Sequence, residues 1–323
     1  MRAAVLTSYG GPEVLKVMDV KRPEPTDEQV LIRVKEAVVT PTDCVFGKGS
    51  PVVSRVFTGL IRPRKKIPGE IFGGIVEKTG SNVTGFKPGD RVYGSAGMKL
   101  GAYAEYICIG ENSAIVKKPD RLQYGTAAGI CDGGLTAYGF LKGLIDIKKD
   151  QKIMIIGASG SVGSHAVQLS NYFGAEVTGV CSTKHIELVR SLGAVHVIDY
   201  TKTDITRGNG KYDVIFDVAA KSSFAKCKKN LKENGVYMTT FPTPDILMHR
   251  LFRSKYKGKQ ALFAATGLKK NPEKRQILER LNEMAESGAI EEVVDKRYEL
   301  QDIVEAFRYV GKGHKTGNVI ISI

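Results

Sequence analysis

Ile153-Met154-Ile155-Ile156-Gly157-Ala158-Ser159-Gly160-Ser161-Val162-Gly163 is the stretch that decides the fold, because an apolar run passes through a glycine-rich turn into a helix expected over 162–173. Backbone N–H groups at a helix N-terminus bind phosphate when no side chain intervenes. Gly160 would let phosphates approach closely, and Gly163 would let the helix pack against the strand. Ala158 stands where the usual G-x-G-x-x-G pattern has its first glycine. The stretch predicts binding of a dinucleotide pyrophosphate.

Short apolar runs alternate with helical stretches after residue 122. Unbroken β-rich runs between amphipathic helices are typical of a parallel sheet that is covered on both faces. The runs are 153–156, 177–180, 196–198, 214–216, 236–238 and 261–263. They predict an α/β fold with a doubly wound parallel sheet of the Rossmann type.

The two ends of the chain have a different pattern. The N-terminal part reads as short strands separated by turns, with alternation over 30–35, 73–77 and 102–107. A helix is expected from residue 271 to Gly288, a second over 303–309, and a final strand over 319–323. We expect this last strand to return to the N-terminal domain, which makes the sheet domain an insertion. The predicted boundaries are 1–123 and 267–323 for the outer domain and 124–266 for the sheet domain.

The end of the second predicted strand indicates which dinucleotide is used. In sites that prefer NAD, an acidic residue here holds the ribose 2′-hydroxyl. Residues 179–185 contain no carboxylate but include Ser182 and Lys184. Hydroxyls and a cation suit a 2′-phosphate, so NADP(H) is the predicted cofactor. The alternative for Lys184 is an ordinary exposed residue of the next helix.

Composition limits the class of protein. The 323 residues are 42% hydrophobic and carry a formal net charge of +14. No apolar run reaches the roughly 18 residues of a membrane span, and five scattered cysteines indicate reduced thiols. We therefore expect a cytoplasmic protein without a membrane partner. The charge, with clusters at 226–229 and 253–259, leaves RNA binding as an alternative function.

Several sequence motifs occur in a fixed order between the N-terminus and the start of the sheet domain. They are Met1-Arg2-Ala3, Gly10-Gly11-Pro12-Glu13-Val14-Leu15, Thr40-Pro41-Thr42-Asp43, Pro68-Gly69, Val83–Val92, Gly101–Tyr106 and Leu135-Thr136-Ala137-Tyr138. With the glycine turn, the chain resembles the zinc-free quinone oxidoreductase branch of the medium-chain dehydrogenase/reductase superfamily. The resemblance implies a GroES-like, mostly β catalytic domain built from both chain ends, and a homodimer.

The resemblance also implies roles for individual residues. It places Ser161 and Val162 at the pyrophosphate, with Gly160 and Gly163 forming the turn. Around the adenosine 2′-phosphate it places Ser182, Lys184 and Tyr200. Beside the nicotinamide it places Thr136, Thr240 and Phe241. For Thr136 and Phe241, a role in the apolar core is the alternative.

Thr40 departs from the family pattern, which often has an asparagine there. A hydroxyl can still donate one hydrogen bond, so Thr40 is the candidate donor to the substrate oxygen. At the places where related alcohol dehydrogenases have their zinc ligands, this chain has Thr40, Glu70 and Asp132, which are a poor ligand set for Zn²⁺. Without a Lewis acid, quinones and other α,β-unsaturated carbonyls are easier to reduce than simple ketones. The sequence predicts an NADPH-dependent quinone or enone reductase, with an alcohol or aldehyde dehydrogenase as the alternative.

Residues 50–66 combine apolar and basic side chains. Apolar pairs at 52–53, 56–57 and 60–61 alternate with five cations, Arg55, Arg62, Arg64, Lys65 and Lys66. The stretch is interpreted either as a gate over a ring substrate or as a solvated surface loop.

Overall fold

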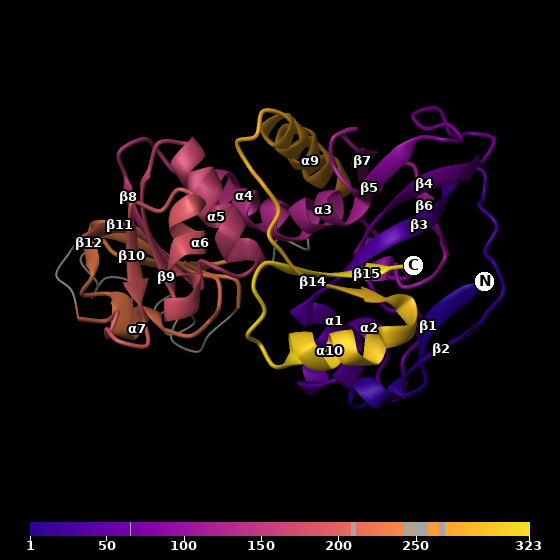
Figure 1. Cartoon of the computed structure of the whole chain (residues 1–323), viewed down its shortest axis with the longest axis horizontal. Helices are drawn as coiled ribbons and strands as arrows, with labels where there is room; N and C mark the ends of the chain where they lie inside the picture. Colours follow the sequence, from indigo (N-terminus) through magenta and orange to yellow (C-terminus); the bar gives the residue numbers. More distant parts are fainter. Residues whose placement is uncertain (65, 208–210, 242–245, 247–257, 265–268) are drawn as a thin grey trace. The chain divides into compact units, whose positions relative to one another are not determined.

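The computed structural model describes residues 1–64, 66–207, 211–241, 246, 258–264 and 269–323 (Figure 1). The chain forms two compact units. The catalytic unit contains residues 1–132, 270–286 and 292–323, and the nucleotide unit contains residues 133–269 and 287–291. The first change of unit therefore falls at 132/133, inside a helical run, whereas the sequence placed it at 123/124.

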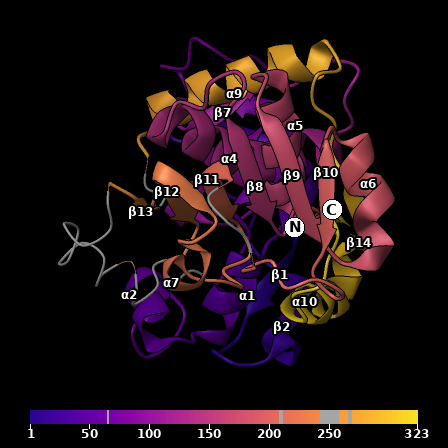
Figure 2. The ribbon, with the colours of Figure 1, turned by 90° about the vertical axis from the view of Figure 1, so that its left-hand side faces the viewer.

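The nucleotide unit is built on six parallel strands. They are β8 (Lys152–Ile156), β9 (Glu176–Cys181), β10 (His196–Asp199), β11 (Tyr212–Asp217), β12 (Leu231–Thr239) and β13 (Gln260–Phe263). Their spatial order, β10-β9-β8-β11-β12-β13, is that of a doubly wound dinucleotide-binding sheet, which confirms the predicted fold (Figure 2). In such sheets the ligand lies at the carboxyl ends of the strands where the order reverses, here β8 and β11.

Helices cover this sheet. Those of the nucleotide unit are α4 (Leu135–Tyr138), the π-helical η5 (Gly139–Leu144), α5 (Ser161–Tyr172), η6 (Thr183–His185), α6 (Ile186–Ser191) and α7 (Phe224–Cys227). Helix α5 packs against β8 and β9, and α6 packs against β9 and β10. The apolar residues of β8 are buried, as the unbroken run predicted.

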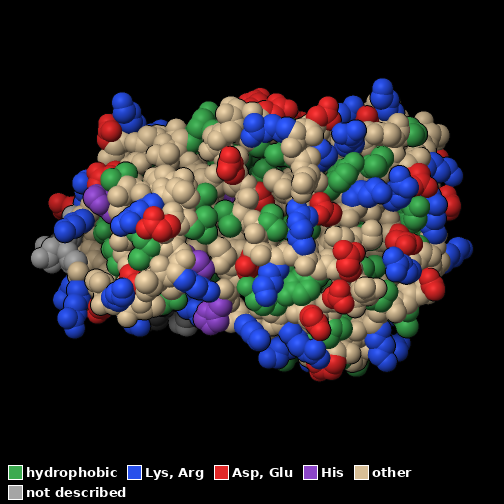
Figure 3. Space-filling model, viewed as in Figure 1, with side chains coloured by type: hydrophobic (Ala, Val, Ile, Leu, Met, Phe, Trp, Pro, Cys, Tyr) green, Lys and Arg blue, Asp and Glu red, His purple; other side chains and the backbone are tan. Residues whose placement is uncertain are grey.

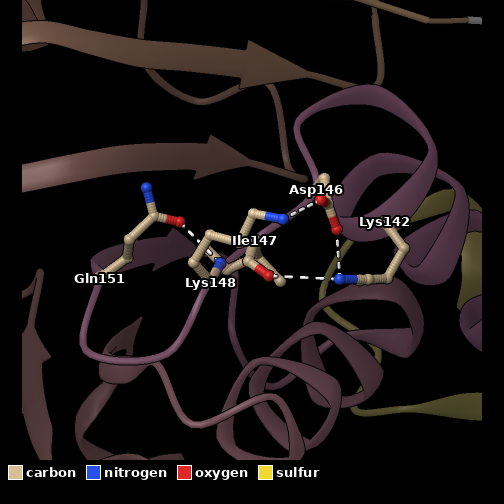
Figure 4. A network of polar contacts seen from close by, with 5 residues as sticks. All are labelled: Lys142, Asp146, Ile147, Lys148 and Gln151. Atoms are coloured by element: carbon tan, nitrogen blue, oxygen red, sulfur yellow. Dashed lines mark hydrogen bonds and ion pairs between the residues drawn. The ribbon is translucent and has the colours of Figure 1, made fainter.

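A polar turn leads from η5 into β8 (Figure 4). The ammonium groups of Lys142 and Lys148 both donate hydrogen bonds to the carboxylate of Asp146, and Lys148 N donates to Gln151 Oε1 at 2.8 Å. These two cations lower the pKa of Asp146 to about 2. The carboxylate therefore stays ionised at neutral pH and closes a backbone turn in which Asp146 has a φ of 49°.

The catalytic unit is mostly β. Its strands are β1 (Arg2–Leu6), β2 (Leu15–Asp19), β3 (Gln29–Val39), β4 (Ile71–Thr79), β5 (Arg91–Ser95), β6 (Tyr106–Gly110), β7 (Ala114–Lys117), β14 (Val294–Glu299) and β15 (Asn318–Ser322). One sheet has the order β14-β15-β3-β4-β5-β7 with β6 paired to β3, and β1 pairs with β2. The antiparallel pairing of β15 with β3 confirms that the last strand returns to the N-terminal domain.

The helices of the catalytic unit are short except for one. They are η1 (Pro12–Val14), α1 (Pro41–Lys48), η2 (Val52–Ser54), α2 (Arg55–Thr58), η3 (Gly97–Lys99), α3 (Tyr124–Gly129), α9 (Asn271–Glu286), η9 (Leu300–Asp302) and α10 (Ile303–Gly311), while the π-helical η4 (Ile130–Gly134) joins the units. One predicted strand is displaced, because β6 starts at Tyr106 rather than at residue 102. Before it, Ala104 makes only an isolated bridge to Ala3.

Candidate active site

The glycine turn after β8 is open where a phosphate would lie. Gly160 is the N-cap of α5, and as a glycine it has no side chain with which to cap the first helical turn. A Cβ on Gly160 would meet only Gly157 O, at 3.6 Å. A Cβ on Gly163 would lie 2.0 Å from Gly157 O, so helix and strand meet without room for a side chain. The two glycines therefore have different tasks, since Gly163 permits the packing and Gly160 keeps the turn accessible.

The loop after β11 flanks this turn and is held by a buried carboxylate. Asp217 accepts hydrogen bonds from Ala219 N at 3.2 Å, Ser222 N at 2.8 Å and the Tyr237 hydroxyl at 3.0 Å. A Cβ on Gly157 would lie 2.9 Å from Ala219 Cβ, which shows how closely the loop passes the turn. Sequence reasoning missed Asp217, although its place at the end of an apolar strand was a usable signal.

The predicted 2′-phosphate residues follow β9 and β10. Tyr200 N donates to Cys181 O at 3.1 Å, which brings the two strand ends together, and the Tyr200 side chain is 55% exposed. Lys184 is exposed and makes no hydrogen bond or ion pair with any residue that the structure describes. His185 was not predicted. Its Nδ1 lies 3.1 Å from Ser159 Oγ and 3.3 Å from Ser182 Oγ, so it ties the glycine turn to the end of β9.

A carboxylate that the sequence prediction did not consider lies close to these residues. Asp199, the last residue of β10, accepts hydrogen bonds from the Thr183 hydroxyl at 2.5 Å and from the Thr201 hydroxyl at 2.7 Å and amide at 2.9 Å. The hydroxyl hydrogen bonds of Thr183 and Thr201 lower the pKa of Asp199. Its oxygens are thus engaged by the protein itself, which limits what they can offer to a ribose.

The residues predicted beside the nicotinamide also belong to the nucleotide unit. The Thr240 hydroxyl donates to Val218 O at 3.2 Å, which brings the end of β12 to the loop after β11. Phe241 is 51% exposed, which is unlike the core residue of the alternative interpretation. Thr136 is partly buried on α4.

In the catalytic unit, Thr40 lies in a buried hydrogen-bonded cluster with Asp43 and Tyr103. Asp43 Oδ2 accepts from Thr40 N at 2.9 Å, from Thr40 Oγ1 at 2.7 Å and from the Tyr103 hydroxyl at 2.8 Å. Asp43 N in turn donates to Thr40 Oγ1 at 3.1 Å, which completes a capping box at the start of α1. The predicted donor hydroxyl therefore points its hydrogen at Asp43.

Burial raises the pKa of Asp43 to about 6, against hydrogen bonds from Thr40 and Tyr103 that lower it. Asp43 and Tyr103 were both missed by sequence reasoning. The signal for Asp43 was the spacing Thr40-x-x-Asp43, which is that of a capping box with Asp in place of Glu. No local signal indicated Tyr103, because it lies 60 residues further along the chain.

The other two residues at predicted ligand positions also have partners. Ser95 Oγ donates to Glu70 Oε1 at 2.5 Å. Asp132 interacts electrostatically with Lys315, whose ammonium group donates to Gly317 O at 2.5 Å and Asn318 Oδ1 at 3.2 Å. Burial lowers the pKa of Lys315, while Asp132 and neighbouring carboxylates oppose that shift.

The basic clusters that suggested RNA binding are only partly described. Residues 253–257 lie outside the described residues, whereas Lys226 and Lys229 are exposed around α7. On the face shown in Figure 3, Lys and Arg side chains alternate with Asp and Glu side chains. Within each unit, the described residues on this face therefore mix both signs of charge and do not form the continuous basic stripe that tracks a nucleic acid backbone. In the described part of the chain, no helix has the length and apolar character to cross a bilayer.

Comparisons with known proteins agree with both units. The alcohol dehydrogenase GroES-like domain matches residues 26–120, and the zinc-binding dehydrogenase family matches residues 192–321. An NADPH-dependent alkenal/one oxidoreductase of Arabidopsis thaliana is 32% identical, over 99% of this chain and 79% of the relative. A 2-methylene-furan-3-one reductase of Solanum lycopersicum is also 32% identical, with the same coverage. The quinone oxidoreductase structure from Coxiella burnetii has a TM-score of 0.87 at 26% identity, covering 100% of this chain and 99% of that one.

The Rossmann sheet, the open glycine turn and the GroES-like unit define a dinucleotide-dependent oxidoreductase. Within that class, the chain belongs to the quinone oxidoreductase branch of the medium-chain dehydrogenase/reductase superfamily, as its sequence motifs predicted.

One matching family is named for zinc binding, but Thr40, Glu70 and Asp132, which stand at the places of the zinc ligands, do not fit a zinc ion. The set offers a hydroxyl and two carboxylates in place of thiolate and imidazole. The Thr40 hydroxyl is engaged by Asp43, and the ammonium of Lys315 would repel a dication at Asp132. Among the described residues, no three His, Cys, Asp or Glu side chains are grouped so as to hold a metal ion.

Proposed function

We propose that this protein reduces quinones or other α,β-unsaturated carbonyls with NADPH, by hydride transfer that does not use zinc. The observation that carries the proposal is the pairing, in one unit, of an open glycine turn at Gly160 with Lys184, which is exposed and has no partner among the described residues. The names of the Arabidopsis and Solanum relatives, an alkenal/one oxidoreductase and a furanone reductase, describe the same chemistry.

The choice of NADPH over NADH rests on charge. Lys184 can form a charge-assisted hydrogen bond with a 2′-phosphate, and Ser182 and Tyr200 offer hydroxyls near it. Asp199 does not oppose this assignment strongly, because its oxygens already accept three hydrogen bonds from Thr183 and Thr201.

Reduced NADP supplies the hydride when bound, and the protein supplies position. Ser161 and Val162 would hold the pyrophosphate at the start of α5, where Gly160 leaves it room, and Thr136, Thr240 and Phe241 would border the nicotinamide. A quinone or enone is electron-poor, so its reduction needs only a hydrogen bond to the carbonyl oxygen and a proton. The side chains of Thr40, Glu70 and Asp132 do not suit a metal ion that could act as a Lewis acid on a simple ketone or alcohol.

Thr40 is the proposed hydrogen-bond donor to the substrate oxygen. Its hydroxyl has one hydrogen, now donated to Asp43, so that hydrogen must turn from Asp43 to the substrate. Thr40→Ser keeps the hydroxyl and should retain kcat, whereas Thr40→Val should lower kcat with little change in the KM for NADPH. Equal kcat values in the two variants would remove Thr40 from this role.

The activity is tested by following NADPH oxidation with a panel of quinones, enones, aldehydes and alcohols, with and without a chelator. We expect turnover of quinones or enones that the chelator does not change. Turnover confined to aldehydes or alcohols, or lost with the chelator, would support the alternative of a dehydrogenase that uses metal.

We further propose a homodimer in the cytoplasm. The dimer follows the family resemblance, and the five free cysteines suit a reducing compartment. Burial also raises the pKa of the Cys44 thiol to about 12, so this thiol is protonated at neutral pH. The Arabidopsis relative is named as chloroplastic, so cell fractionation is the test of compartment, and light scattering on the purified protein is the test of assembly.

A further inference from the structure

Residues 51–66 of the catalytic unit have an inverted distribution of side chains. The segment comprises η2, α2 and the turn that follows, and we call it the 51–66 segment (Figure 2). Its polar residues Ser54 and Thr58 are buried, at 5% and 4% exposure. Ser54 Oγ has no hydrogen-bond partner among the described residues, so its burial is unfavourable. The segment thus turns polar groups inward, which is the reverse of an ordinary surface helix.

Its aliphatic side chains face outward. Their exposed fractions are high, at 70% for Val52, 65% for Val53, 67% for Val56, 66% for Leu60 and 91% for Ile61. Single exposed apolar residues are common, but five within ten positions form a patch, and such patches mark interaction sites.

The inner side of the segment fixes this orientation. The Tyr9 hydroxyl donates to Gly59 O at 2.5 Å and lies 2.7 Å from Thr58 Oγ1. The guanidinium of Arg55 donates to Gly49 O at 2.9 Å and stacks over the Tyr9 ring at 4.8 Å. Arg64 N donates to Thr58 O at 2.8 Å. The outward aliphatic face is therefore held in place by hydrogen bonds on the opposite side.

The charge around the patch has one sign. No Asp or Glu occurs between Asp43 and Glu70, whereas six Lys and Arg residues do. Of these, Arg62, Arg64 and Lys66 are exposed and form no ion pair with the described residues. Aliphatic side chains beside unpaired cations are complementary to a surface that presents phosphates above hydrocarbon. A protein partner, in contrast, would have to present a separate acidic group to each of these cations, whereas an anionic bilayer presents phosphates over its whole surface.

We propose that the 51–66 segment docks the protein on anionic lipid bilayers, with its aliphatic side chains at the level of the acyl chains and Arg62, Arg64 and Lys66 among the phosphates. This differs from the sequence prediction of no membrane partner, which considered only a spanning segment. The inference does not depend on the proposed reductase activity, since it concerns a surface formed by the catalytic unit alone.

Co-sedimentation with vesicles tests this inference. The full chain should sediment with phosphatidylcholine vesicles that contain phosphatidylglycerol, and not with phosphatidylcholine alone. Ile61→Asp and Val56→Asp should each weaken partitioning at least about tenfold, because a carboxylate resists entry and repels the anionic surface. Val195→Asp is the matched control, since Val195 is 62% exposed just before β10 in the other unit, and the partitioning of this variant should not change. Circular dichroism and NADPH binding confirm that each variant is folded.

Three results would overturn the proposal. The first is that wild-type protein does not sediment with anionic vesicles, and the second is that Ile61→Asp and Val195→Asp bind equally well. The third is that Ile61→Asp leaves vesicle binding intact but abolishes self-association, or raises the KM for an enone. That result would assign the patch to a second copy of the chain or to a substrate gate.

Discussion

The glycine turn of the nucleotide unit and the Thr40 cluster of the catalytic unit are built by opposite means. The turn uses backbone atoms and absent side chains, all within Gly157–Gly163. The cluster uses buried polar side chains, and Tyr103 reaches it from 60 residues away. A site made of local backbone geometry can be read from a short stretch of sequence, whereas a site made of distant side chains cannot.

The largest expected effect in this comparison is on Gly163. In Gly163→Ala, the new Cβ would lie 2.0 Å from Gly157 O and 2.9 Å from Ala158 Cα, both backbone atoms with little freedom to move. We expect the free energy of unfolding to fall by about 3 kcal/mol in urea denaturation, with loss of NADPH binding. A variant with wild-type stability would show that helix and strand do not need this close approach.

A comparable effect is expected on Asp43, but it depends on pH. Because the pKa of Asp43 is raised from 3.8 to about 6 in the folded state, its contribution to stability is complete below the unfolded pKa and is lost as the pH rises through about 6. Between these limits the loss amounts to about 3 kcal/mol. Asp43→Asn removes this titration, so the difference in unfolding free energy between wild type and variant should change by that amount between acidic and neutral pH.

The difference between the two proteins cancels the titration of all other groups, which makes the comparison specific to Asp43. NADPH binding should be the same in both, since Asp43 belongs to the catalytic unit. A difference that stays constant with pH would contradict the account of the buried cluster.

Gly160→Ala is the matched partner of Gly163→Ala within the same turn. Its Cβ would meet only Gly157 O at 3.6 Å, so we expect stability to fall by at most about 1 kcal/mol, the effect of alanine at an N-cap. The dissociation constant for NADPH should nevertheless rise at least about tenfold, because the methyl group occupies the space of the phosphates. Unchanged affinity would indicate that the pyrophosphate lies elsewhere.

The smallest effect concerns Lys184 and is confined to one cofactor. Lys184→Ala should raise the KM for NADPH about tenfold, through loss of a charge-assisted hydrogen bond, and leave the KM for NADH unchanged. Stability should not change, because Lys184 has no partner among the described residues. Lys184→Arg should retain most of the preference for NADPH over NADH. If that preference survives Lys184→Ala, Lys184 does not bind the 2′-phosphate.

Much of the fold could be predicted because it depends on local periodicity. The six apolar runs became the six parallel strands β8–β13, and residues 319–323 returned to pair with β3 through β15. The strand expected from residue 102 starts instead at Tyr106, since the backbone N–H groups of Ala102 and Tyr103 donate to Gly69 O and Pro68 O, which lie outside any strand. The unit boundary also shifted to 132/133, because α3 packs against β3 and β4 of the catalytic unit.

In the candidate site too, the residues that local sequence identifies were predicted, and those that depend on tertiary packing were missed. The structure brings the predicted residues Ser182 and Tyr200 to neighbouring strand ends, but Asp199, His185 and Asp217 were missed. Each of these three acts by accepting or sharing hydrogen bonds with residues on another element. The partners of a polar side chain depend on tertiary packing, so residue type and spacing alone could not reveal them.

Calorimetric titration of the purified protein with reduced NADP and, separately, reduced NAD shows whether the glycine turn and Lys184 select the 2′-phosphate. We expect saturable binding of reduced NADP at one site per chain, at least about tenfold tighter than reduced NAD, as one charge-assisted hydrogen bond to the 2′-phosphate requires. No heat with reduced NADP, or tighter binding of reduced NAD, would contradict it.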